Sequence, residues 1–279
     1  MIAKWPLIKE TRLQKIKSCL KCISDNSFDR NKQRSCIMQL YPGKSEKSVF
    51  RGMVIPSLRH LGLILGHAGQ LRISANGILI INSEGISDEF HYRCTSAVIH
   101  EIDKAKFGLL EYLCNNDNVE YSVVIAELIS KNESMKMNQI KERVISWLSL
   151  LTEAKLIDND KKYIKVNKEV LTKTLSDLDI SKIDISDFKN RLFDAYKRLA
   201  RESAGIVDIT DIRYAVVDSC LKDGMIITEE LFDCGLRGLP FVSEDYLISL
   251  GRPMGAEEKL FKYKDSYYRT LSIRILKGK

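Results

Sequence analysis

Few residues in this chain have the types and spacing that chemistry requires. Cys19 and Cys22 form a CxxC pair, and Glu257, Glu258 and Lys259 provide the acidic pair and lysine of a metal-dependent nuclease. A structural zinc site needs four ligands, usually two such cysteine pairs, and no second CxxC occurs. The acidic pair is expected in a polar hairpin, whereas a nuclease needs it on a central sheet. We therefore expect neither a bound metal nor nuclease activity.

Motifs that bind nucleotides or activate a nucleophile are also missing. The sequence contains no GxxxxGK[ST] loop, no GxGxxG after a strand and no GxSxG. Four histidines leave few candidates for a general base, and none pairs with a cysteine in a recognisable catalytic context. The sequence thus predicts a protein that is not an enzyme and carries no cofactor.

Positive charge is concentrated at the start of the chain. Residues 1–60 contain 13 Lys and Arg against 4 Asp and Glu, whereas the other 219 residues contain 31 against 33. Such an excess suits a phosphate backbone, although a solvated basic helix face gives the same count. An amphipathic basic helix is expected over residues 7–24, and its exposed side would carry Lys9, Arg12, Lys15, Lys17 and Lys21.

Composition limits the class of protein. The apolar fraction of 44% and the low Pro and Gly content favour an ordered, helix-rich chain. No run of eighteen apolar residues and no signal-peptide pattern occurs, so we expect a cytoplasmic protein that does not enter a membrane. Seven irregularly spaced cysteines favour reduced, mostly buried thiols over a disulfide framework.

One order of elements recurs three times: short helices, a longer helix, and two short strands joined by a polar turn. This is the plan of a winged helix-turn-helix. The predicted fold class is therefore α+β, mostly α, with three tandem winged-helix units. The expected divisions are 1–83 for the basic helix and first unit, 84–104 for a connector, 105–168 for the second unit, and 169–279 for a helical linker and the third unit.

In the first unit, Arg30–Leu40 is predicted to be a helix. Ser45 can cap a second helix that runs toward Leu61, and Pro56 either kinks this helix or divides it. Two strands are expected at residues 71–74 and 77–81, and the wing tip is expected at residues 66–70.

The second unit shows the clearest pattern. Its longest predicted helix, 138–154, places apolar residues on one face, namely Ile140, Val144, Trp147, Leu148 and Leu151. Residues 163–166 alternate as a half-exposed strand does.

The third unit is looser. Its helices are expected at 188–203, 211–221 and 228–236, and its strands at 246–250 and 267–275. The last strand alternates apolar and polar residues, so one wet face should carry Arg269 and Arg274.

Three segments of the first unit resemble winged-helix units of prokaryotic restriction and phage-defence proteins: Ser48–Met53, Pro56–Ile64 and Ile73–Gly77. Three such units in about 280 residues also resemble the recognition half of type IIS restriction endonucleases. In that family cleavage belongs to a separate C-terminal part, which has no counterpart here. The resemblance therefore implies recognition of a DNA sequence without cleavage, by an isolated domain or a subunit.

We expect the chain to bind double-stranded DNA, with the first unit making the contacts. Lys47, Arg51 and Arg59 are the candidates for groove or flanking contacts, with His60 beside them. Phosphate contacts are expected from Arg34, Lys44 and Arg72. The expected further partner is a nuclease or another subunit of a defence system. Two alternatives stay open: a transcriptional regulator, and a scaffold subunit whose winged helices bind protein.

Overall fold

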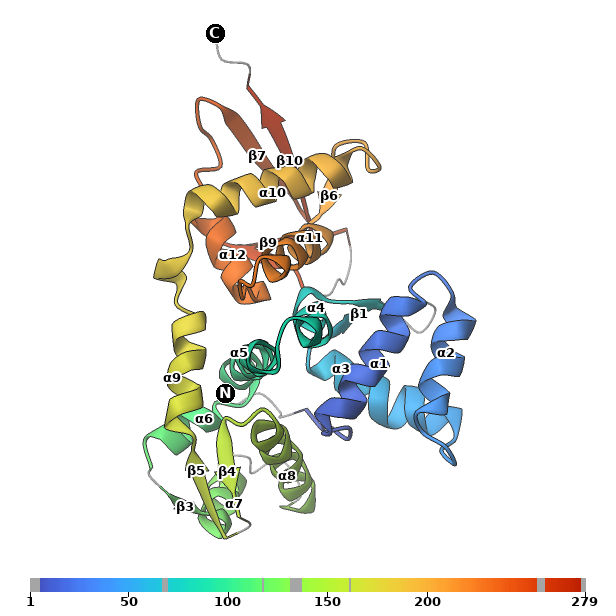
Figure 1. Cartoon of the computed structure of the whole chain (residues 1–279), viewed down its shortest axis with the longest axis vertical. Coiled ribbons are helices and arrows are strands. Elements are labelled where there is room, and N and C mark those ends of the chain that lie inside the picture. Colours follow the sequence, from blue (N-terminus) through green and yellow to red (C-terminus); the bar gives the residue numbers. More distant parts are fainter. Residues whose placement is uncertain are drawn as a thin grey trace. The chain divides into compact units, whose positions relative to one another are not determined.

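The computed structural model describes residues 6–66, 70–116, 118–130, 137–160, 162–254 and 259–276 (Figure 1). The chain is α+β and mostly helical, as the sequence predicted. It divides into an N-terminal unit, residues 1–73 and 80–177, and a C-terminal unit, residues 74–79 and 178–279. No helix able to span a membrane is found among the described residues.

The first part of the N-terminal unit consists of helices followed by one short hairpin. Its elements are α1 (Leu13–Asp25), α2 (Arg30–Gln39), a π-helical turn (Ser48–Met53), α3 (Val54–His60), β1 (Ile64–Leu65) and β2 (Arg72–Ile73). Strands β1 and β2 pair antiparallel, with Ile64 opposite Ile73. The expected strand at 71–74 is thus present as β2, and its partner precedes it in the chain.

The prediction of a strand at 77–81 is wrong. These residues belong to a helix, α4 (Ala75–Asn82). The Ser74 hydroxyl accepts the N–H of Gly77 at 3.1 Å and so caps the first turn. Residues 75–81 are all buried, which explains why the segment is apolar on every side. A short, continuous apolar run suits a buried helix as well as a buried strand, so periodicity could not separate the two.

The rest of the N-terminal unit contains long helices and a three-stranded sheet. Its elements are α5 (Asp88–Lys106), α6 (Leu109–Cys114), β3 (Val119–Glu120), α7 (Tyr121–Ser130), α8 (Met137–Glu153), β4 (Ile157–Asn159), β5 (Tyr163–Val166) and α9 (Lys168–Asp177). The sheet is antiparallel in the order β3-β5-β4. The helix predicted at 138–154 and the strand predicted at 163–166 are confirmed.

The apolar face of α8 lies in the core. All five apolar residues predicted on this face are buried, and Trp147 is completely buried. The Trp147 ring stacks on Phe107 with centroids 4.0 Å apart, and its Nε1–H donates to a carboxylate oxygen of Asp103 at 2.5 Å. Asp103 also accepts the backbone N–H groups of Leu109 and Leu110, so one buried carboxylate joins α5, α6 and α8.

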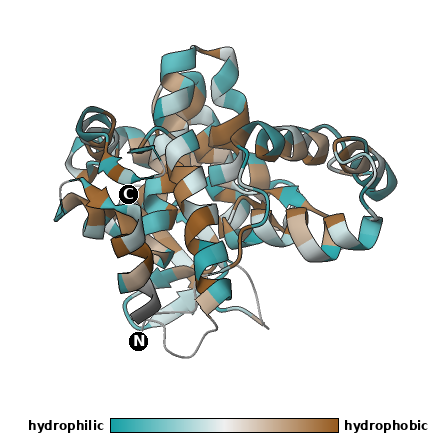
Figure 2. Ribbon diagram, turned by 90° about the horizontal axis from the view of Figure 1, so that it is seen from below, coloured by the Kyte–Doolittle hydropathy of each residue, from teal (hydrophilic) through white to brown (hydrophobic). Residues whose placement is uncertain are grey.

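The C-terminal unit also combines helices with a three-stranded antiparallel sheet, in which two of the strands are longer. Its main elements are α10 (Ile185–Ala200), β6 (Val207–Asp208), α11 (Ile209–Lys222), α12 (Glu229–Gly238), β7 (Tyr246–Gly251), β8 (Phe261–Tyr263), β9 (Ser266–Tyr268) and β10 (Thr270–Ile275). The sheet order is β6-β10-β7, and β8 and β9 form a separate hairpin between β7 and β10. Hydrophilic and hydrophobic residues are mixed along most of the helices (Figure 2).

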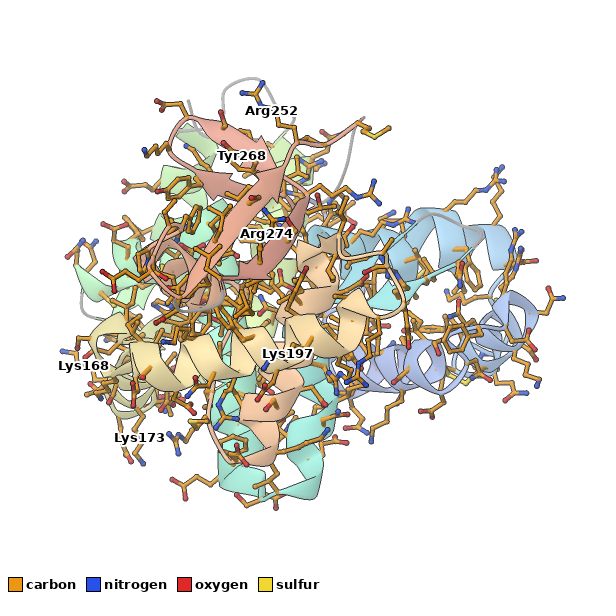
Figure 3. All side chains as sticks on the ribbon, turned by 90° about the horizontal axis from the view of Figure 1, so that it is seen from above. Lys168, Lys173, Lys197, Arg252, Tyr268 and Arg274 are labelled. Atoms are coloured by element: carbon orange, nitrogen blue, oxygen red, sulfur yellow. A yellow bond between two sulfur atoms is a disulfide. The ribbon has the colours of Figure 1, made fainter. Side chains whose placement is uncertain are left out.

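The last predicted strand, 267–275, is divided in the structure. Tyr267 and Tyr268 belong to β9, and β10 begins at Thr270. Arg274 is exposed on β10, as expected, whereas Arg269 precedes the strand and its Nε–H donates to Asp208 at 2.9 Å. Arg274 lies on the sheet, and Arg252 follows the end of β7 (Figure 3).

Candidate nucleic-acid interface

Helix α2, the following turn and the helical stretch 48–60 form the candidate interface. Asp29 caps α2 by accepting the N–H groups of Asn31 and Lys32, each at 3.0 Å. Gly43, with φ of 78°, lies in the turn that follows. The Ser45 hydroxyl then accepts the N–H of Ser48 at 3.2 Å, as expected of a cap.

The second helix of this pair is divided rather than continuous. A π-helical turn occupies Ser48–Met53, and α3 begins at Val54, two residues before Pro56. Proline has no N–H, and its ring collides with the carbonyl four residues earlier, here that of Gly52. The wider π-helical turn lies at this position, so Pro56 fits without ending the helical stretch.

Three of the seven predicted DNA-binding residues lie together on this element. Lys44 lies in the turn, Lys47 just before the π-helical turn, and Arg51 within it. All three side chains are exposed, and none has a hydrogen-bond or ion-pair partner among the described residues. Lys47 and Arg51 are four residues apart, which places them on one side of a helix. The result is a small, unneutralised basic surface, here called the basic turn.

Arg34 lies beside the basic turn and is held in place. Its guanidinium forms an ion pair with Glu46 and lies 5.4 Å from the centre of the Phe50 ring. These contacts connect α2 to the start of the second helix. Arg34 is therefore partly neutralised, which the sequence did not indicate because its partner lies twelve residues away.

Arg59 departs from its predicted outward orientation. Its side chain is half-buried and donates to the carbonyl of Gly66 at 2.6 Å. Gly66 has φ of 87°, and a Cβ atom there would lie 2.3 Å from the carbonyl oxygen of Gln70. Only glycine fits at this position, because a side chain would collide with the returning chain. Arg59 thus stabilises the start of the loop between β1 and β2.

His60 and Arg72 flank the same region. His60 is exposed at the end of α3, where partial burial and the positive charges of Lys106 and Arg143 lower its pKa. It is therefore neutral near pH 7 and can donate or accept a hydrogen bond. Arg72 is exposed in β2. Residues 67–69 of the predicted wing tip lie outside the described residues.

Several other basic side chains of the first sixty residues have partners within the chain. Lys17 and Lys21 both form ion pairs with Glu84, at 3.2 and 2.5 Å. Lys15 donates to the carbonyl of Leu40, and Arg12 pairs with the buried Glu10. The predicted basic face of α1 is therefore largely used in folding, which leaves the basic turn as the more accessible positive surface.

The expectation of reduced thiols is wrong for one pair of cysteines. Cys22 and Cys36 form a disulfide between α1 and α2, which pack against each other. The CxxC partner Cys19 stays free and buried, and burial raises the pKa of its thiol to about 11. A CxxC spacing on one helix could not reveal that Cys22 faces a cysteine on the next helix.

Lys259, the lysine of the nuclease-like triplet, has a structural partner. It forms a partly buried ion pair with Glu229, and its carbonyl accepts from Arg213 at 2.5 Å. Glu257 and Glu258 lie outside the described residues. Within the described part of the chain, no group of three His, Cys, Asp or Glu side chains could hold a metal ion.

Comparison of the chain with models of known protein families, with curated proteins and with solved structures gave no match.

Proposed function

We propose that the chain is a non-catalytic protein that binds double-stranded DNA through the basic turn. The observation that carries this proposal is the position of Lys44, Lys47 and Arg51 before and within the second helix of an α2–α3 pair. In helix-turn-helix proteins, residues at the start of this helix contact base edges in the major groove. Arg34 and Arg72 would contact flanking phosphates, which fix register without reading sequence.

The order of elements supports three winged-helix units. Helices α1, α2 and α3 precede the β1–β2 hairpin in the first unit. The second unit runs α6-β3-α7-α8-β4-β5, and the third α10-β6-α11-α12-β7-β10. In both, the first strand pairs with the last, and the last pairs with the middle one. A helix–strand–helix–helix–strand–strand order with this pairing is the winged-helix arrangement.

Sequence recognition in a prokaryotic restriction or defence system is the role we propose, with a nuclease or another defence subunit as partner. The resemblance of the first unit to restriction proteins supports it. A transcriptional regulator would use the same surface. A scaffold role has one favourable observation: α8, which would be the recognition helix of the second unit, exposes the apolar side chains of Met137 and Ile145.

Salt dependence of DNA binding tests the proposal. We would measure fluorescence anisotropy of a labelled random-sequence duplex with the full chain at about 50 and about 200 mM salt. If the parent protein neutralises about five phosphates, its affinity should fall about five-hundredfold between these conditions. Reversing Lys44, Lys47 and Arg51 to Glu removes three phosphate contacts. The affinity of this variant should be much weaker and should fall only about tenfold between the two salt concentrations.

A charge-matched variant distinguishes the basic turn from general attraction. Lys168, Lys173 and Lys197 are exposed on α9 and α10 (Figure 3), and their reversal to Glu changes the net charge equally. This control should keep most of the parent's salt dependence. Equal losses of DNA affinity in the two triple variants would contradict the proposal. A parent affinity that does not change with salt would do so as well.

A further inference from the structure

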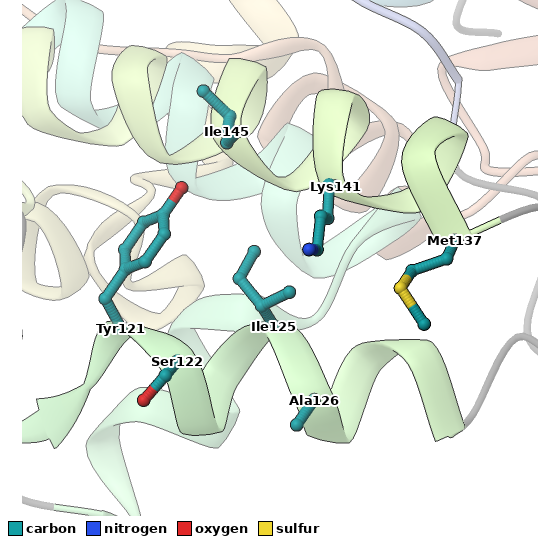
Figure 4. Close-up of a pocket in the computed structure, with 7 residues that line it drawn as sticks. All are labelled: Tyr121, Ser122, Ile125, Ala126, Met137, Lys141 and Ile145. Carbon is teal, nitrogen blue, oxygen red and sulfur yellow. The ribbon is translucent and has the colours of Figure 1, made fainter.

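A pocket of about 380 Å³ lies between α7 and α8 in the N-terminal unit (Figure 4). Its volume is within the range of small-molecule sites in proteins. Seven residues line it: Tyr121, Ser122, Ile125, Ala126, Met137, Lys141 and Ile145.

Residues of α7 form one wall of the pocket. Tyr121 and Ile125, one helical turn apart, point toward α8 (Figure 4), and the short, exposed side chains of Ser122 and Ala126 complete this wall. The opposite wall is a stripe on α8 formed by Met137, Lys141 and Ile145, each four residues from the next. Met137 is 55% exposed and Ile145 is 51% exposed, so the two helices leave apolar surface in contact with solvent.

The polar groups of the pocket are donors. The Lys141 ammonium and the Tyr121 hydroxyl point into the space between the two helices (Figure 4). Neither has a hydrogen-bond or ion-pair partner within the described part of the chain. Burial raises the pKa of Tyr121, so its hydroxyl stays protonated and can donate. The seven lining residues include no acidic side chain.

We propose that this pocket binds a small carboxylate with an apolar body, such as a medium-chain fatty acid. The carboxylate would accept hydrogen bonds from Lys141 and Tyr121, and the apolar body would cover Ile125, Met137 and Ile145. A cationic ligand would be repelled by Lys141, and a neutral apolar ligand would gain nothing from its charge. The site is separate from the basic turn and does not depend on DNA binding.

Decanoate binding to the full chain, observed at the methionine methyl groups, tests this proposal. In protein labelled with ¹³C at these methyl groups, the Met137 signal is assigned from its loss in the Met137→Leu variant. Decanoate, added below its micellar concentration, should shift this signal to saturation, whereas decanol should bind more weakly. Lys141→Gln should weaken decanoate binding about fivefold, because an ion pair at an exposed lysine is lost, and should leave decanol binding unchanged.

Two further variants locate the site. Lys165→Gln removes an exposed lysine of β5 and should not affect decanoate. Ala126→Leu enlarges an exposed side chain of the pocket lining, so the chain should still fold and decanoate binding should weaken. Equal affinity for decanoate and decanol in the parent, or unchanged decanoate binding in Ala126→Leu, would overturn the proposal. An absent shift of the Met137 signal would do so as well.

Discussion

Replacing Trp147 with phenylalanine should lower the free energy of unfolding by about 3 kcal/mol. The Trp147 Nε1–H donates to Asp103 at 2.5 Å, and the two residues are 0% and 1% exposed. A hydrogen bond to a charged group contributes about 1.5–3 kcal/mol, and its loss leaves the carboxylate with one donor fewer. Phenylalanine can still stack on Phe107, but its smaller ring leaves a small cavity, which adds about 1 kcal/mol.

Alanine at the same position would be more severe. Truncation of a buried aromatic side chain costs about 3–5 kcal/mol, and loss of the Asp103 hydrogen bond adds to it. Because the stability of a domain is about 5–15 kcal/mol in total, Trp147→Ala should unfold or aggregate. Trp147→Phe is therefore the variant whose stability can be measured.

Urea unfolding followed by circular dichroism at neutral pH measures the difference. Glu142→Ala, an exposed position on the same helix, is the control and should change stability by less than about 0.5 kcal/mol. If Trp147→Phe unfolds at the same urea concentration as the parent protein, the Trp147–Asp103 contact does not stabilise the fold. If Trp147→Ala melts normally and loses only binding to a partner, the placement of Trp147 in the core is wrong.

Substitutions at three other sites test contacts within the fold. Burial raises the pKa of Asp103 to about 6, so the folded chain binds its proton more tightly than the unfolded chain. The free energy of unfolding should therefore fall by up to about 3 kcal/mol as the pH rises from about 4 to about 6, and urea titrations of Asp103→Asn should lack this slope. Cys36→Ser removes the disulfide with Cys22. Because this disulfide closes a short loop, its removal should lower the free energy of unfolding by about 3 kcal/mol. Thermal melts of the parent protein with a reductant should show the same loss of stability. Lys259→Ala leaves the partly buried Glu229 carboxylate without its ammonium partner and should cost about 1.5–3 kcal/mol in urea unfolding. Lys259→Met combined with Glu229→Gln should recover most of this loss.

The sequence determined the elements whose patterns are local. Apolar residues of α8 recur at helical spacing, and those of β5 alternate with polar ones, so both were located from the sequence. The cap at Ser45 and the irregularity near Pro56 were likewise predicted. These features depend on interactions within one or two turns of the chain, where residue types and spacing fix the backbone hydrogen bonds.

Helix α4 shows where local patterns fail. Its apolar run fits either a strand or a helix, and contacts distant in sequence contribute to the helix. The N–H of Asn76 donates to the Glu229 carboxylate at 3.1 Å, and the Asn76 side chain accepts the N–H of Glu229 at 2.9 Å. These two residues are 153 positions apart, so no pattern within the segment could contain this information.

The candidate interface combines both kinds of information. Sequence identified the basic fifth of the chain, in which Lys44, Lys47 and Arg51 stay exposed. Only the tertiary structure decided that Arg59 turns inward and that two lysines of α1 pair with Glu84. A count of charges is fixed by composition, but the charge that remains for a partner depends on which side chains folding brings together. That outcome depends on packing between elements, because an ion pair forms only where two surfaces place opposite charges within a few ångströms.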